Sequence, residues 1–136
     1  MKKSSVYFLI ISLALFACQL NAQDAINKQV YQTVEKMPTF PGGETKLANY
    51  LKSNIKYPAD ARKNKLSGTV MVSFVVDENG TISNALPIKE VEGDIEHSLA
   101  KEAIRVVYNM PKWTPGKEKG KAVSVQYNLP VRFELK

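Results

Sequence analysis

The chain has 136 residues, with 19 basic and 13 acidic side chains and a formal net charge of +6, and its length fits a single domain. The lysines are scattered through predicted turns, not gathered with aromatic residues into one basic stripe. This pattern disfavours nucleic acid as a partner and indicates that the charge serves solubility. One cysteine, Cys18, and one histidine, His97, are too few for a structural zinc site, which needs four nitrogen or sulfur ligands.

The N-terminus has the pattern of an export signal, because two lysines precede the apolar stretch Val6–Ala17. This stretch is short for a helix that spans a bilayer, which needs roughly 20 apolar residues. Two processing routes are open. Cleavage after Ala22 would make residues 1–22 a signal peptide and release a periplasmic protein without cysteine. Alternatively, the four residues that end at Cys18 resemble a lipobox, in which Cys18 would be lipidated.

Residues 23–37 are polar and predict a flexible lead-in, with a short strand around Val30–Val34. Prolines and glycines follow, and the domain is expected to occupy residues 38–136. Apolar residues at helical spacing then predict a helix over Glu44–Asn54. A second short helix is expected from Tyr57-Pro58, because proline suits a first helical turn.

A hairpin is the clearest local prediction. Gly68–Val76 alternates between two faces, and Asp77–Gly80 supplies turn residues. The second strand is expected from Thr81 to about Lys89, and Pro87 predicts that it lies at an edge of the sheet or ends there. Its apolar residues are expected on one side of that strand; they are Ile82, Leu86 and Ile88.

The main helix is predicted over Asp94–Asn109, with one apolar stripe that faces the core. Acidic residues gather just before it, where they favour a helix start, and they lack the spacing of a calcium-binding loop. They are Glu90, Glu92, Asp94 and Glu96. Trp113, which follows the helix, is expected to seal its end against the sheet.

The last segment, Val123–Leu135, alternates apolar and polar residues throughout, which predicts a long strand with one buried face. Pro130 lacks an N–H group, so this strand is expected either to lie at a sheet edge or to break its pairing at Pro130. Together the elements predict an α+β fold, in which helices pack on one face of a small antiparallel sheet of about three strands.

No catalytic constellation is present in the sequence. His97 adjoins Ser98 on the predicted helix, where the two side chains face different directions, and it is interpreted as a surface residue. The glycines are isolated turn residues, not a phosphate-binding loop. We therefore expect neither an enzyme nor a cofactor.

Five segments in order resemble the C-terminal domain family of TonB, over about residues 38–136. They are Tyr57–Arg62, Gly68–Gly80, Glu102–Val107, Pro111–Gly116 and Gly120–Phe133. The resemblance implies a periplasmic module that binds outer-membrane transporters. A short "box" peptide of the transporter would add as a strand to the domain's sheet, with backbone hydrogen bonds giving affinity.

The resemblance places this contact on the last strand before Pro130. The residues implied are Val123, Ser124, Val125, Gln126, Tyr127, Asn128 and Leu129.

The chain departs from a complete TonB, which has a permanent N-terminal membrane helix and a long proline-rich spacer. We therefore expect it to bind the box peptide without pulling on it, and to reach the inner-membrane motor through another protein. The exposed edge also predicts a strand-exchanged homodimer. The alternative is an envelope-associated structural or regulatory adaptor, lipidated at Cys18, that reuses the fold without energy transduction.

Overall fold

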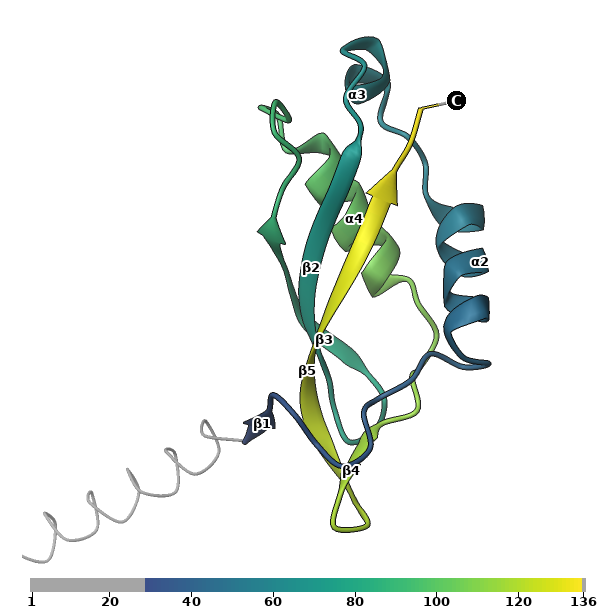
Figure 1. Ribbon diagram of the computed structural model, residues 1–136, viewed down its shortest axis with the longest axis vertical. Helices are drawn as coiled ribbons and strands as arrows, with labels where there is room; N and C mark the ends of the chain where they lie inside the picture. Colours follow the sequence, from purple (N-terminus) through teal and green to yellow (C-terminus); the bar gives the residue numbers. More distant parts are fainter. Residues whose placement is uncertain (1–28, 136) are drawn as a thin grey trace, which may run out of the picture.

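The computed structural model describes residues 29–135 and has an α+β fold (Figure 1). Its sheet has the strand order β1-β5-β2-β3. These strands are β1 (Val30–Tyr31), β5 (Lys121–Phe133), β2 (Gly68–Val76) and β3 (Ile82–Lys89). The short strand β4 (Gly116–Glu118) pairs with the beginning of β5. In this part of the chain, three long antiparallel strands therefore carry the fold, as the sequence predicts.

Within the described residues, three helices accompany the sheet: α2 (Glu44–Asn54), α3 (Ala59–Lys63) and α4 (Ser98–Tyr108). Helix α4 lies across one face of the sheet (Figure 1), where it contacts β3 and β2, and its apolar stripe is buried in the core. Helix α2 joins α4, because the Tyr50 hydroxyl donates to the carbonyl of Val106 at 2.9 Å. Helix α2 has the predicted bounds, and α3 begins directly after Pro58.

Helix α4 begins at Ser98 and not at the predicted Asp94, because two turns occupy the residues between Val91 and His97. The Asp94 side chain instead accepts from the helix's first amides. Its Oδ1 accepts from Ser98 N–H at 3.0 Å and its Oδ2 from Leu99 N–H at 2.9 Å. Asp94 therefore satisfies two of the amides that a helix start leaves without partners.

The prediction for one face of β3 is wrong. Ile82 packs against the core, whereas Leu86 and Ile88 are 61% and 55% exposed. The pairing with β2 shifts register twice along β3, and Asn84 adopts a left-handed conformation with φ 52°. Such bulges insert extra residues, so the side chains beyond them no longer alternate in step with Ile82.

Trp113 closes the core, as its sequence position predicts. It is 3% exposed and lies edge-on to the rings of Phe40, Phe74 and Tyr127, with centroid separations of 5.9, 5.4 and 5.0 Å. Its backbone N–H donates to the carbonyl of Gly80 at 2.9 Å. Trp113 thus joins the segment that follows α4 to the turn between β2 and β3.

An ion pair on α4 holds the chain between α2 and α3. Glu102 accepts from Arg105 Nε and from the backbone N–H of Lys56, both at 2.6 Å, and Arg105 Nη2 donates to the carbonyl of Asn54 at 3.0 Å. Partial burial acts to raise the pKa of the Glu102 carboxyl. The hydrogen bonds from Arg105 and Lys56 outweigh burial and hold this pKa below its ordinary value.

Within residues 29–135, no helix is long and apolar enough to cross a membrane. The predicted signal peptide and Cys18 lie outside the described residues.

Candidate functional site

The sheet has two lateral edges, and the edge at β3 is closed to a further strand. Its two register shifts distort the ladder, and Pro87 has no N–H group to donate. The backbone N–H of Ala85 already donates to the Tyr108 hydroxyl at 2.9 Å. Bulges, proline and a side-chain partner are the devices by which natural sheets prevent unwanted pairing.

The second lateral edge of the sheet, at β5, is mostly without a pairing strand among the described residues. Along β5, every residue from Val125 to Phe133 pairs with β2. On the side away from β2, the strand β1 pairs in parallel with Ser124 and Val125 only. Among residues 29–135, no strand pairs with that side from Gln126 to Phe133. We call the side of β5 away from β2, over Ser124–Phe133, the outer edge.

The structure brings the predicted binding residues together on β5, with alternating surroundings. Val125 and Leu129 are buried in the core, and Tyr127 is partly buried beside them. Gln126 is half-buried and Asn128 is exposed. The side chains of Gln126 and Asn128, together with the backbone, are therefore available to a partner at the outer edge.

The predicted open edge is wrong at Ser124 and Val125, because β1 pairs there. Val123 lies in the hairpin with β4, opposite Gly116. The sequence predicts a strand near Val30 but gives no sign that it would pair with the last strand. The predicted region is therefore open only from Gln126 onward.

A chain of side-chain hydrogen bonds runs across the sheet beside β1. Gln32 donates to Gln126 Oε1 at 2.6 Å, and Gln126 Nε2 donates to the hydroxyl of Ser73 on β2 at 2.7 Å. The lead-in thus contacts β5 through a side chain as well as through the β1 backbone. Gln32 is not among the predicted site residues, and its sequence context gives no signal for this role.

Aromatic packing holds the middle of β5 in place. The Tyr127 ring contacts Trp113 and Phe74, at centroid distances of 5.0 and 5.7 Å. Burial raises the pKa of the Tyr127 hydroxyl, and the nearby Glu44 carboxylate raises it further. Tyr127 therefore stays neutral at physiological pH and supports the edge from within the core.

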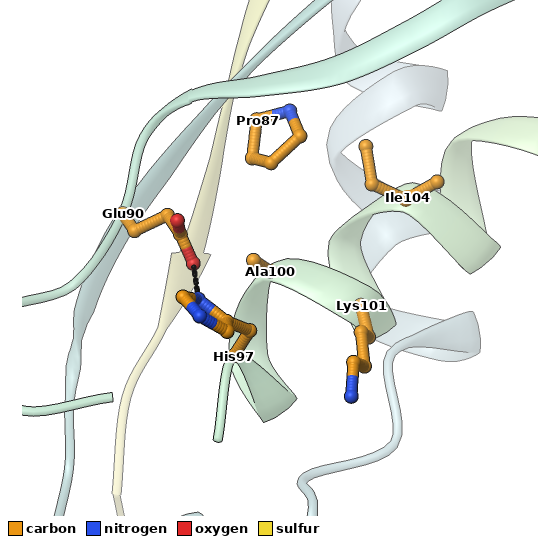
Figure 2. A pocket seen from close by; sticks show the side chains of 6 residues that line it. All are labelled: Pro87, Glu90, His97, Ala100, Lys101 and Ile104. Carbon is orange, nitrogen blue, oxygen red and sulfur yellow. Dashed lines mark hydrogen bonds and ion pairs between the residues drawn. The ribbon is translucent and has the colours of Figure 1, made fainter. Parts of the chain in front are cut away.

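A shallow pocket of about 300 Å³ lies between the end of β3 and α4 (Figure 2). Pro87, Ala100 and Ile104 form its apolar part, and the ring Nδ1 of His97 lies 2.7 Å from a Glu90 carboxylate oxygen. His97 is exposed just before α4, which agrees with its interpretation as a surface residue. Within residues 29–135, no three potential metal ligands gather. The residues that line the pocket include no nucleophile paired with a base.

A family model for the C-terminal region of the Gram-negative bacterial TonB protein matches residues 53–135. The chain belongs to this family. TonB C-terminal domains are non-catalytic interaction modules of the Gram-negative envelope, and they generally bind outer-membrane transporters.

Two NMR solution structures of the TonB C-terminal domain from Helicobacter pylori are similar to this chain. Their sequence identities are 20% and 22%, with a TM-score of 0.47 in each case. The alignments cover 71% and 68% of this chain, and 87% and 92% of the Helicobacter chains. No curated protein sequence matches the chain.

Proposed function

We propose that this TonB-type domain binds an extended peptide of outer-membrane transporters in the periplasm, by adding it as a strand to the outer edge of β5. The observation that carries this proposal is the contrast between the two edges of the sheet. The edge at β3 is closed by bulges, Pro87 and Tyr108, whereas the outer edge of β5, among the described residues, is unpaired from Gln126. An unpaired, regular edge is a template for a further strand.

Binding of this kind uses the backbone first. Each peptide residue whose N–H or C=O faces β5 would exchange hydrogen bonds with the strand, and peptide side chains would alternate between the two faces. On one face they would meet Gln126 and Asn128, and on the other the edge of the core near Tyr127. The binding region is Val123–Leu129 as the family resemblance implies, with Gln126–Leu129 accessible without any rearrangement.

The direct test is a titration of the isotope-labelled full chain with box peptides of the same cell's outer-membrane transporters, followed by backbone amide shifts. We expect the largest shifts in β5 between Val123 and Leu129, and small shifts in β3. Shifts centred on β3 or on the pocket near His97 would contradict the proposed edge. Silence with every peptide would favour the envelope adaptor, which reuses the fold without a box.

A matched pair of peptides separates backbone pairing from other contacts. In a strand, alternate N–H groups point to opposite edges, so methylation of alternate backbone nitrogens can be made in two versions. The version whose methyl groups face β5 should bind at least about tenfold more weakly, because each lost hydrogen bond costs about 1 kcal/mol. The other version should bind like the parent peptide. Equal loss in both versions would contradict strand addition.

A further inference from the structure

We propose that Val30–Gln32 is a built-in competitor of the transporter peptide, which occupies the start of the outer edge and must leave before a peptide can use its whole length. This inference rests on the proposed function and concerns the regulation of the same site. It commits to one occupant of the edge in the free protein, namely the chain's own lead-in.

The lead-in segment already makes the contacts expected of an added strand. Val30 lies opposite Ser124 and Tyr31 opposite Val125, in parallel orientation. Gln32 continues the contact through its side-chain hydrogen bond to Gln126. Val125 also pairs with Val76 of β2, so both sides of this residue are occupied. A second strand cannot pair with the same backbone groups of β5.

The lead-in is held weakly at Val30 and Tyr31, which we call its tip, and firmly at the residues that follow, from Val34 to Lys36. β1 has two residues, and Val30 is 40% exposed. Behind the tip, Val34 is 8% exposed, and the backbone of Lys36 exchanges hydrogen bonds with Lys117 at 3.1 and 2.8 Å. The tip is therefore displaced at low cost while its anchor stays in place. A tethered segment of this kind has a high effective concentration and returns when the peptide leaves.

The geometry predicts how peptides of different register behave. A peptide that pairs only from Gln126 onward shares the outer edge with β1, whereas one that reaches Ser124 must displace β1. The apparent dissociation constant then equals the intrinsic one divided by the fraction of molecules in which β1 is undocked. If that fraction is on the order of one tenth to one third, freeing the edge tightens binding by about three- to tenfold.

The test uses Tyr31→Pro in the full chain, because proline removes the N–H group and disfavours pairing at the centre of the contact. The matched control is Gln29→Pro, which places the same residue just before β1, at an exposed position. Alternate N–H groups of a strand point to opposite edges, so hydrogen exchange of those amides between Ser124 and Gln126 that point to the outer edge reports β1 docking without any ligand. We expect faster exchange at these positions in Tyr31→Pro only, with β2 amides unchanged.

Affinities for the transporter box peptides are then measured for all three proteins. We expect about three- to tenfold tighter binding by Tyr31→Pro, unchanged binding by Gln29→Pro, and loss of the Val30–Ser124 contact when peptide binds the unmodified chain. Equal affinities of the three proteins, or a bound state that keeps the Val30–Ser124 contact, would overturn the competitor role and leave the proposed function standing. Absence of binding in all three would overturn both.

Discussion

The backbone N–H of Ala85 donates to the phenol oxygen of Tyr108 at 2.9 Å, so a side chain of α4 satisfies a backbone donor of β3 that has no partner on β2. Tyr108 is the last residue of α4, and the residue is 50% exposed. One residue therefore joins helix to sheet and closes the edge that does not carry the proposed binding site. The contrast between β3 and β5 depends in part on this hydrogen bond.

We expect Tyr108→Phe to lower the free energy of unfolding by about 1 kcal/mol, because it leaves the Ala85 N–H without a protein partner. The same change removes one of the three features that close β3, while the bulges and Pro87 remain, so self-association should increase only slightly with concentration. Urea unfolding and light scattering after size-exclusion chromatography measure the two effects. Tyr31→Phe, which removes a hydroxyl from the half-buried Tyr31 on β1, is the control. A Tyr108→Phe protein with unchanged stability would contradict the role of this bond.

Gly80 and Gly120 form a matched pair for testing the close approach of the hairpin turn to Trp113, because both have positive φ angles, of 82° and 77°. A Cβ on Gly80 would lie 2.0 Å from the carbonyl oxygen of Trp113, whereas nothing lies within 4 Å of one on Gly120. Gly120→Ala should cost about 1 kcal/mol for the left-handed conformation alone. Gly80→Ala should cost about 2–4 kcal/mol, because the turn must also move away from Trp113. Equal costs in thermal unfolding would show that the contact between turn and Trp113 is unimportant.

Acid should weaken the connection between α4 and the chain after α2. The pKa of Glu102 is lowered in the folded state, from an ordinary value of 4.5. A carboxyl whose pKa is lower in the folded state stabilises the fold at any pH above the pKa of the unfolded state. This stabilisation is lost as the pH falls through the pKa of the folded state. Urea unfolding between pH 7 and pH 3 should therefore show a smaller loss of stability in Glu102→Gln than in the unmodified chain. Glu96→Gln, the same change on an exposed residue, should leave the pH dependence intact.

The elements of this fold could be predicted from sequence wherever one periodicity extends over many residues. The bounds of α2 and β2 agree with the prediction, because apolar spacing and turn residues favour the same structure there. The start of α4 differs from the prediction, because an acidic residue such as Asp94 is typical of a first helical turn. In the structure, Asp94 lies before the helix and accepts a hydrogen bond from its first amide. The faces of β3 differ because a bulge is a property of strand pairing and leaves no periodic signal.

The candidate site could be predicted only in part, for a related reason. Alternation along β5 identifies its buried face, but it does not reveal which strands flank it. The pairing of Val30 with Ser124 joins residues far apart in sequence, and β1 is too short to show a pattern of its own. The hydrogen bond from Gln32 to Gln126 likewise depends on tertiary structure alone.

The start of α4 should depend on one buried carboxylate. Asp94 is 6% exposed, and its two oxygens accept from the amides of Ser98 and Leu99. Asp94→Ala leaves these amides without that partner and should lower the free energy of unfolding by about 1–2 kcal/mol, as for other lost helix caps. Asp94→Asn retains one acceptor oxygen and should cost less. Urea unfolding at pH 7, with Glu92→Ala as the exposed control, measures the series. If Asp94→Ala and Glu92→Ala were equally stable, the helix would begin without help from Asp94, and its packing against β3 and β2 would have to come from the apolar stripe alone.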